Sequence, residues 1–314
     1  MMLSIIINSL ILSLKYTIKL SIIVLIIMFI VDVFINLGGL KFLEKIFSPI
    51  LKRLDINPLL ISSILACFLS PTVGYSILSE LYKDKQISEK EVIATSLANS
   101  FPSVFAHTFT FFVPIVIPLL GFVGIIFILI RLGVAFIKTC IGLFLLNIFS
   151  SKKEIKIIQN QEVNKKKTFK SSFKRIIKFA KRLVPTMFFM LFLVSILSKI
   201  GFFDYLTKIF YPITSLLNLN PNVITIVFTE IINVQSAIIL SSALLNEGLI
   251  SGKDVLIGLI LGNVLTFSSR YIKHSLPLQV SLFGKLGFKI VMINAIITLI
   301  LDIIIIAMLI FLRI

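Results

Sequence analysis

The chain contains little charge for its length, and it has no tryptophan. Only 14% of its 314 residues are charged, whereas 58% are apolar and the mean hydropathy is +1.08. Soluble domains have about a quarter charged and about half apolar residues. This composition excludes a water-soluble globular protein, and the sequence predicts an all-α, polytopic membrane protein instead.

Residues that commonly build catalytic and metal centres are also scarce. The chain has two cysteines, Cys67 and Cys140, and two histidines, His107 and His274, without the spacing of metal ligands. It contains no phosphate-binding loop, dinucleotide fingerprint or nucleophile elbow. We therefore expect no enzyme activity, no metal site and no resident cofactor. We expect both cysteines to fill the apolar core.

Positive charge is concentrated in one segment. The net charge is +17, and residues 151–182 supply +10 of it through 12 Lys or Arg against Glu154 and Glu162. A local basic run is typical of a topology determinant or of a segment that binds an anionic leaflet. It is not the basic face of a folded nucleic-acid-binding domain. The lipid bilayer is thus an expected partner, and nucleic acid is not.

The sequence repeats itself with an offset of 163 residues. Residues 15–146 align with residues 178–309 without a gap, and more than two dozen positions are identical, about twice the number expected by chance. We therefore expect two domains of one fold, 1–150 and 178–314, joined by a basic linker, 151–177. The matched positions include residues that constrain the backbone, such as Gly38 and Gly201, Asn57 and Asn220, Pro58 and Pro221, Pro114 and Pro277, and Gly121 and Gly284.

Each repeat is predicted to contain a spanning helix, an amphipathic interfacial helix (39–54 or 202–217), a re-entrant hairpin, an interrupted helix and a long helix. The hairpin segments have about a dozen apolar residues before a polar break, too few to cross a bilayer. Loops 38–57 and 82–91 contain seven Lys or Arg, and their equivalents contain two. Since positive loops face the cytoplasm, the repeats are predicted to be inverted, with the linker inside and both termini outside.

Neutral polar residues gather at the paired breaks. Unwound backbone is tolerated in a bilayer only when it is buried in protein or lines a polar cavity. We therefore expect a midplane cavity that binds a small polar solute, although such residues also join transmembrane helices. The predicted substrate-binding residues are Ser70, Thr72, Gly74, Asn99, Ser100, Ser103, Asn233, Gln235, Ser236, Asn263, Thr266 and Ser268.

Glu230 is the acidic residue closest to a break. An intramembrane carboxylate is by default a functional candidate, so Glu230 is predicted to couple transport to an ion, either sodium or a proton. A structural alternative is a salt bridge to Arg270. Asp32 and Asp302 lie near the ends of apolar runs, so we expect them to reach the interface and to have a structural role.

The order of these elements, with tips Ser-Pro-Thr-Val-Gly at 70–74 and Asn-Val-Gln-Ser-Ala at 233–237, resembles the nucleoside recognition or Gate membrane domain. That domain recurs in concentrative nucleoside transporters, ferrous iron permease B and spore maturation proteins A and B. The resemblance implies that the tips and the interrupted helices, 99–103 and 263–269, hold solute and sodium. The transporters have an acidic Glu-Phe-Val type motif where this chain has Asn99-Ser100-Phe101-Pro102, a departure at the nucleoside site.

Two functions follow from these observations. The first is a secondary transporter or permease of the cytoplasmic membrane, for a nucleoside-like solute or a cation, that works by alternating access. The second is a membrane scaffold or signalling partner that uses the basic linker and does not transport. Assembly as a homo-oligomer is compatible with both.

Overall fold

The computed structural model describes residues 2–36, 49, 56–149, 169–201, 214–215, 219–265 and 275–311. The described chain is helical, as an all-α membrane protein requires. The predicted interfacial helices, 39–54 and 202–217, and most of the linker 151–177 lie outside the described residues. α8 begins at Phe169, inside the range predicted as linker.

The first half consists of a long helix, a helical hairpin, an interrupted helix and a second long helix. Asn57 Oδ1 caps the hairpin by accepting from Leu59 N at 3.0 Å. Ser88 and Glu91 form a capping box that begins the interrupted helix. The elements are α1 (Met2–Asn36), α3 (Pro58–Leu69), α4 (Pro71–Lys83), α5 (Glu89–Ala98), α6 (Ser100–His107), the π-helix η1 (Thr108–Val116) and α7 (Ile117–Phe149).

The described elements of the second half follow the same order, and two of its helices have side-chain caps equivalent to those of the first half. Asn220 Oδ1 accepts from Asn222 N at 2.9 Å, and Ser251 Oγ accepts from Asp254 N at 3.2 Å. Each of these residues lies 163 positions after its counterpart in the first half. The elements are α8 (Phe169–Lys199), α10 (Asn222–Ile232), α11 (Val234–Asn246), α12 (Gly252–Leu265), α14 (Leu276–Phe283) and α15 (Lys285–Phe311).

The backbone itself repeats at the two irregular positions of each half. Ser70, between α3 and α4, has φ −160° and ψ 119°, and Asn233, between α10 and α11, has φ −160° and ψ 125°. Gly121, at the bend near the start of α7, has φ 56° and ψ −128°, and Gly284, before α15, has φ 59° and ψ −132°. Positive φ of this kind strongly favours glycine. The matched glycines therefore mark the same turn in both halves.

The halves contact each other reciprocally. Ser79 Oγ on α4 donates to Leu282 O on α14 at 2.7 Å, and Ser242 Oγ on α11 donates to Leu119 O on α7 at 2.6 Å. Both donors and both acceptors are related by the offset of 163 residues. Two surfaces that exchange identical contacts are typical of a twofold relation. Each of the two apolar cores likewise combines residues of one half with residues of the other.

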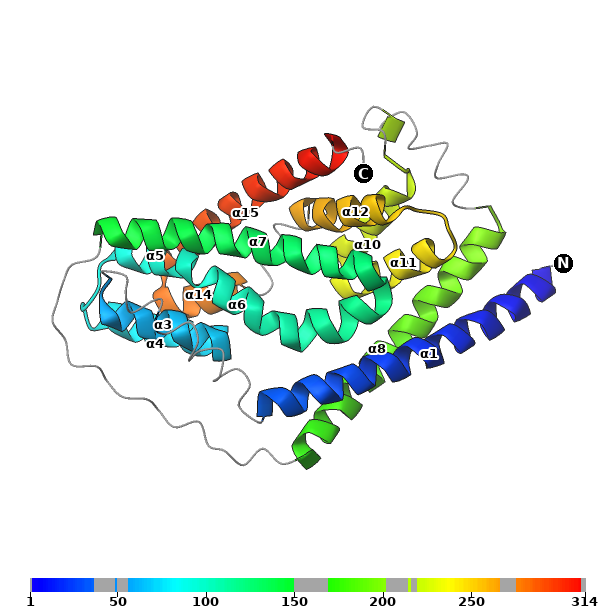
Figure 1. Cartoon of the computed structure of the whole chain (residues 1–314), viewed down its shortest axis with the longest axis horizontal. Helices are drawn as coiled ribbons and strands as arrows, with labels where there is room; N and C mark the ends of the chain where they lie inside the picture. The colour runs from blue at the N-terminus through cyan, green and yellow to red at the C-terminus, as the bar shows by residue number, and fades with distance from the viewer. Residues whose placement is uncertain are drawn as a thin grey trace.

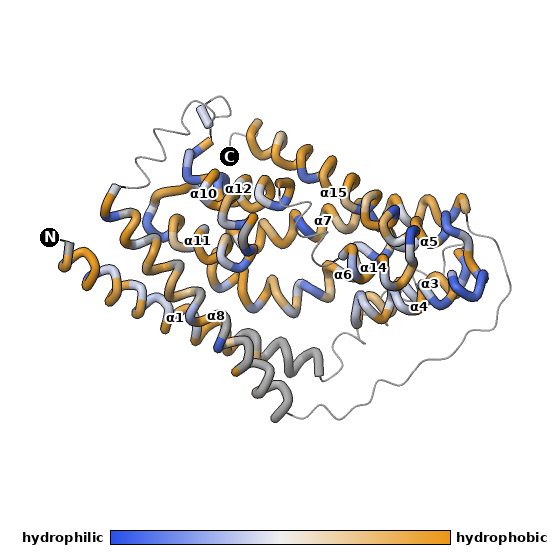
Figure 2. The backbone as a smooth tube through the Cα atoms, turned by 180° about the vertical axis from the view of Figure 1, so that it is seen from behind, coloured by the Kyte–Doolittle hydropathy of each residue, from blue (hydrophilic) through white to orange (hydrophobic). Residues whose placement is uncertain are grey.

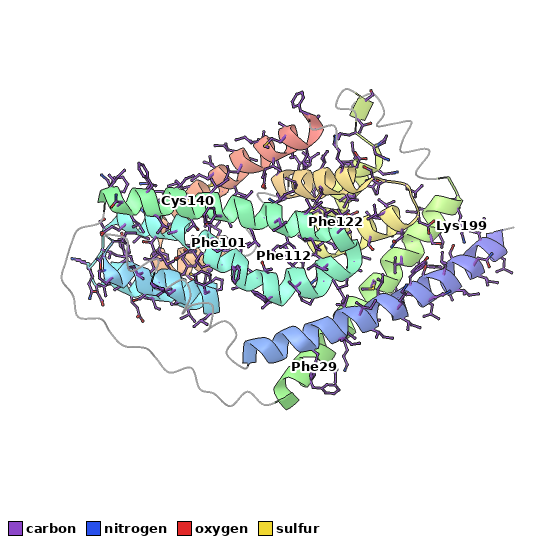
Figure 3. All side chains as sticks on the ribbon, viewed as in Figure 1. Phe29, Phe101, Phe112, Phe122, Cys140 and Lys199 are labelled. Carbon is purple, nitrogen blue, oxygen red and sulfur yellow. The ribbon has the colours of Figure 1, made fainter. Side chains whose placement is uncertain are left out.

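Large apolar side chains cover the outside of the long helices, and polar ones are buried. On α7, Phe122, Leu129 and Phe144 are 74%, 61% and 65% exposed, whereas Lys138 and Thr139 are buried. Orange, the apolar colour, accordingly dominates on α7 and α15 in Figure 2, and Phe122 marks the bend at the start of α7 in Figure 3. A soluble protein would show the opposite distribution. These outer faces are suited to lipid.

Within the described residues, three helical stretches are long and apolar enough to cross a bilayer, Ile5–Ile26, Glu89–Phe149 and Lys285–Phe311. The hairpin helices Pro58–Leu69, Asn222–Ile231 and Val234–Asn246 are apolar but shorter, as the re-entrant arrangement predicts. Figure 1 shows α1 and α8 side by side and running in opposite directions, and α7 and α15 also run in opposite directions.

Candidate functional site

The first hairpin is closed by a hydrogen bond beside its tip. Ser63 Oγ on α3 donates to Gly74 O on α4 at 2.9 Å. The two helices touch here, since a Cβ at Gly74 would lie 2.8 Å from Ser63 O and closer still to Cys67 Sγ. Ser70 is half-buried and Thr72 is exposed. Of the three residues predicted at this tip, Gly74 therefore determines how closely the helices pack.

Asn99 joins the interrupted helix to this hairpin. It lies between α5 and α6, its side chain is fully buried, and its Nδ2 donates to Ser63 Oγ at 3.2 Å. The structure thus brings Asn99 of the break and Gly74 of the tip together through Ser63. Asn99 Oδ1 has no hydrogen-bond partner within the described ranges. It is a buried acceptor available to a ligand.

The broken backbone beside Asn99 is bridged by α7. Thr139 Oγ1 donates to Ala98 O at 2.9 Å and accepts from Phe101 N at 2.9 Å. One hydroxyl therefore satisfies both the backbone donor and the backbone acceptor that flank the break. The hydrocarbon core of a bilayer contains no water that could satisfy them. Ser100 is buried and Ser103 is half-buried nearby. Sequence reasoning missed Thr139, although its position within a long apolar helix was visible.

Aromatic rings cover this break. Phe101 packs edge-on against Phe68 at the end of α3, with ring centroids 6.4 Å apart, and against Phe136 of α7 at 5.8 Å. Phe105 also meets Phe68, at 5.9 Å. Figure 3 shows Phe101 on the interrupted helix below α7. The polar contacts of Asn99 and Thr139 therefore lie next to an aromatic cluster that spans three helices.

At the second tip, a side chain of the tip pairs with backbone N–H groups of the same tip. Asn233 Oδ1 accepts from Gln235 N at 2.8 Å and from Ser236 N at 3.1 Å, which caps α11. The side chains of Gln235 and Ser236 are half-buried. The predicted role of Asn233 as a ligand stays a prediction, since its side-chain oxygen is already a double acceptor for the backbone.

Glu230 lies buried on α10 against Gly262 of α12. A Cβ at Gly262 would lie 3.0 Å from both the Cβ and the Cδ of Glu230. In the first half the equivalents are Cys67 and Asn99, so the bulky polar side chain has changed from the interrupted helix to the hairpin. The absence of a side chain at Gly262 provides the space that the carboxylate occupies. The two halves are therefore alike in backbone and different in chemistry.

One polar contact between the halves involves Arg131, which the sequence analysis did not select. Arg131 NH1 on α7 lies 3.2 Å from both carboxylate oxygens of Asp302 on α15, and Asn263 Nδ2 on α12 donates to the same carboxylate. Asp302 is 1% exposed, so the expectation that it reaches the interface is wrong. Asn263, predicted to line the solute cavity, donates to this carboxylate, and its role in binding a solute stays a prediction. Arg131, an ionisable residue inside an apolar helix, was the signal for this pair.

A second charged residue on α7 faces α15 on the same side. Lys138 Nζ donates to Thr298 Oγ1 at 3.1 Å, and Thr298 Oγ1 donates to Asn294 O at 2.9 Å. Asn294 Nδ2 in turn donates to Ser96 Oγ on α5 at 3.0 Å. Together with Arg131, Asp302 and Asn263, these residues form what we call the seam cluster. It joins α5 and α7 of the first half to α12 and α15 of the second.

The remaining predicted residues are not all placed. Thr266 and Ser268 lie outside the described residues, as do Arg270 and His274, so the proposed Glu230–Arg270 pair stays a prediction. In the part of the chain that is described, no group of His, Cys, Asp and Glu could hold a metal ion. Cys67 is buried as expected, but Cys140 is exposed on α7, so its expected place in the core is wrong.

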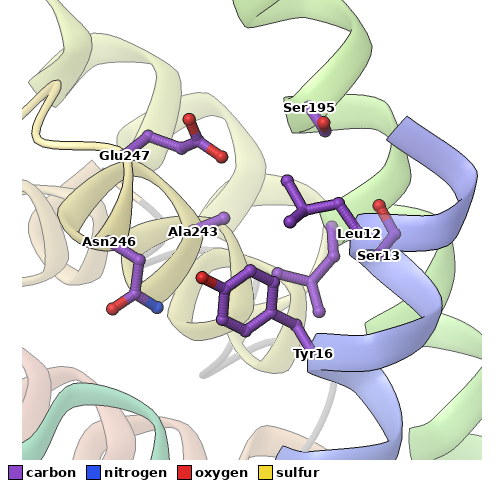
Figure 4. Close-up of a pocket in the computed structure, with 8 residues that line it drawn as sticks. Leu12, Ser13, Tyr16, Ser195, Ala243, Asn246 and Glu247 are labelled. Atoms are coloured by element: carbon purple, nitrogen blue, oxygen red, sulfur yellow. The ribbon is translucent and has the colours of Figure 1, made fainter. Parts of the chain in front are cut away.

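A shallow pocket lies away from both tips. It is formed by α1, α8 and α11, with Tyr16, Asn246 and Glu247 among its lining residues, and its empty volume of ≈ 360 Å³ includes open solvent. Figure 4 shows these side chains around it. Asn246 ends α11, whereas Asn233 precedes its first residue. The pocket is therefore not the predicted midplane cavity.

Comparison with known proteins identifies the family. The family model for nucleoside recognition, called Gate, matches residues 17–122, from α1 to the bend at the start of α7. The chain belongs to this family. Gate domains are found in nucleoside transporters and permeases, so the Gate family makes a role in membrane transport plausible. The matched residues correspond, at the offset of 163, to residues 180–285 of the second half.

The relatives are of similar length to this chain. The uncharacterized protein MJ0871 of Methanocaldococcus jannaschii is 61% identical over 296 residues, which cover 94% of this chain and 93% of the relative. A second protein of that organism, MJ0880, is 30% identical over 85% of this chain and 89% of its own length. No solved structure matches the chain.

Proposed function

We propose that this Gate protein is a secondary transporter or permease of the cytoplasmic membrane, and that it moves a small polar solute by alternating access. The observation that supports this most is the pair of symmetry-related helix breaks, at Ser70 and Asn233, each beside an interrupted helix. Paired discontinuous helices at the interface of two repeats are the usual binding site of secondary transporters. The occurrence of Gate domains in transporters supports the same interpretation.

The two repeats are proposed to be inverted with respect to the membrane. Equivalent long helices run in opposite directions in Figure 1, and the loops with most positive charge in one half have neutral or acidic equivalents in the other. In the α4–α5 turn Lys83 and Lys85 are exposed, whereas the equivalent α11–α12 turn has Asn246 and Gly248. Positive residues mark the cytoplasmic side. The α4–α5 turn and the basic segment 151–182 are thus assigned to the cytoplasm.

The solute class follows from the groups at the first break. Asn99 offers an unpaired carbonyl oxygen, and Ser63, Ser100 and Ser103 are neutral hydroxyls in or next to the same region. Neutral donors and acceptors suit an uncharged polar solute, such as a nucleoside, or a cation held by oxygen atoms. Glu230, in the equivalent place of the other half, is proposed to bind the coupling ion, sodium or a proton.

The proposal is tested by ligand-induced stabilisation of the purified protein. Nucleosides, bases, amino acids, sodium and divalent cations are screened at two pH values for a shift in the unfolding temperature. A ligand at 100 times its dissociation constant adds about 2.7 kcal/mol to the stability. We expect a shift that Asn99→Ala or Gln235→Ala removes and that the control Ser62→Ala, at an exposed serine of α3, retains. A shift that survives both substitutions would show that the solute binds elsewhere.

The coupling role of Glu230 is tested separately. Glu230→Gln keeps the shape of the side chain and removes its charge, so the stabilising effect of sodium or of pH on solute binding should be lost. If the sodium and pH dependence of Glu230→Gln equals that of the natural protein, Glu230 is not the coupling residue.

The second candidate function, a membrane scaffold or signalling partner, is favoured by one observation. Residues 151–182 concentrate 12 Lys or Arg, which suits binding to an anionic surface. Neutralising the lysines and arginines between residues 152 and 175 distinguishes the two functions. Loss of cellular function in that variant, with no effect of Asn99→Ala and Gln235→Ala, would favour the scaffold.

A further inference from the structure

The seam cluster contains one more positive than negative charge among the described residues. Arg131 and Lys138 lie seven positions apart on α7, and Asp302 is the carboxylate opposite them on α15. Asp302 is paired with Arg131. No carboxylate forms an ion pair with Lys138 among the described residues, and Lys138 is only 7% exposed. A buried cation without a paired anion is costly.

The hydrogen bond from Lys138 uses only one of the N–H donors that an ammonium group would have. Thr298 Oγ1 donates its hydrogen to Asn294 O, so it must accept from Lys138 Nζ. Thr298 therefore takes one of the three N–H groups that an ammonium would present. The amine form, with two hydrogens and a lone pair, leaves fewer donors unsatisfied. With the amine form, Arg131 and Asp302 balance each other and the seam cluster is neutral.

The protonated form of Lys138 has one anion to face. Asp302 lies four residues after Thr298, one turn along the same face of α15. Among the other titratable groups of the described helices that pack here, His107 at the end of α6 and Lys285 and Lys289 on α15 are exposed. Glu91 on α5 is held in its capping box with Ser88, at 2.8 and 2.9 Å, at the far end of that helix from Ser96. On α12 the residue that faces the cluster is the neutral Asn263.

We propose that Lys138 is a proton-exchanging site between the two halves, and that Asp302 turns from Arg131 toward Lys138 when Lys138 takes up a proton. The step adds one proton to the amine and changes the charge of the seam cluster from zero to +1; no other bond is formed or broken. The inference rests on the proposed function, because it provides the transporter with a coupling proton. It assigns that proton to the contact between α7 and α15, which must change if the halves move against each other, and it leaves sodium as the ion that Glu230 is proposed to bind.

The test measures stability against pH and needs no solute. The full chain in lipid nanodiscs is unfolded by heat between pH 5 and pH 9.5, and helix content is followed by circular dichroism. If Lys138 loses its proton within the folded protein in this range, the unfolded chain binds one proton more, so stability rises with pH. The unfolding temperature should then rise by about 3–5 °C per pH unit within the titration.

Three variants make the test specific. Lys138→Met has nearly the same shape and no charge, and it should remove the pH-dependent difference, so that its gap to the natural protein widens as the pH falls. Lys289→Met, at an exposed lysine of α15, should follow the natural protein. Thr298→Val removes the acceptor of Lys138 and should move the midpoint of the pH profile; this variant decides the question if Lys138→Met does not fold.

Two results would overturn the proposal. One is a profile of Lys138→Met parallel to that of the natural protein, or of Thr298→Val with an unmoved midpoint. The other is a stability gap that follows phosphate or chloride concentration at constant pH, which would make the seam cluster an anion site. Neither result changes the outcome of the solute screen at the helix breaks. If the solute screen is negative, the pH dependence of stability still decides whether Lys138 exchanges a proton.

Discussion

Replacing Gly74 by alanine should destabilise the first hairpin strongly, because α3 and α4 touch at this residue. An added Cβ would lie 2.8 Å from Ser63 O and closer still to Cys67 Sγ, whereas ordinary contact begins at 3.4 Å. The helices must therefore separate by about 0.6 Å. That movement also weakens the hydrogen bond from Ser63 Oγ to Gly74 O.

The magnitude follows from three opposing contributions. Overpacking costs about 1–3 kcal/mol, and the weakened hydrogen bond costs about 1 kcal/mol. Alanine is a better helix former than glycine by about 1 kcal/mol. The net loss of stability for Gly74→Ala is therefore about 1–3 kcal/mol.

The matched control is Gly133→Ala on α7. A Cβ at Gly133 meets no atom within 4 Å, so this variant should be neutral or gain up to about 1 kcal/mol. Unfolding of both variants in mixed detergent micelles, followed by circular dichroism, measures the difference. Removing Cys67 Sγ in the double variant Gly74→Ala with Cys67→Ala should recover part of the loss. If Gly74→Ala is as stable as Gly133→Ala, the described hairpin packing is wrong.

Three further predictions concern the other contacts. Thr139→Val leaves a buried backbone donor and acceptor unpaired and should cost about 2–4 kcal/mol in the same unfolding assay; Thr139→Ser should keep both bonds. Ser88→Ala and Ser251→Ala remove equivalent caps and should each cost about 1 kcal/mol; a large inequality would contradict the structural equivalence of the halves. Asp302→Asn leaves Arg131 without its anion and should cost about 3–5 kcal/mol, much of it recovered by adding Arg131→Met; additive losses would show that the two side chains do not interact.

The ends of the hairpins could be predicted from the sequence because local signals determine them. Asn57 and Asn220 are caps followed by proline, and the tips at Ser70 and Asn233 interrupt apolar runs. The offset of 163 residues then transfers each assignment from one half to the other. The structure places α4 and α11 at matching residues, Pro71–Lys83 and Val234–Asn246.

The contacts between distant helices could not be predicted from the same signals. Asn263 was expected to line a solute cavity because it belongs to a predicted interrupted helix, and no sequence pattern indicated that α15 would present Asp302 to it. Arg131 lies 171 residues from Asp302, and Lys138 lies 160 residues from Thr298. The rotation of α7 against α15 depends on packing that no local pattern encodes. The first half has its large polar side chain on the interrupted helix, at Asn99, whereas the second half has Gly262 there and Glu230 on the hairpin. This exchange is visible only when the hairpin and the interrupted helix are packed together.

The central claim, that the halves are inverted copies enclosing a site, is tested most directly by the sidedness of two equivalent turns. Asp84 in the α4–α5 turn and Glu247 in the α11–α12 turn are both exposed and lie 163 residues apart. Each is replaced singly by cysteine after Cys140→Ser; the natural Cys67 is buried. A membrane-impermeant maleimide is then applied to intact cells and to inside-out vesicles. The account predicts labelling of Glu247→Cys in cells and of Asp84→Cys in vesicles; labelling of both from the same side would contradict it.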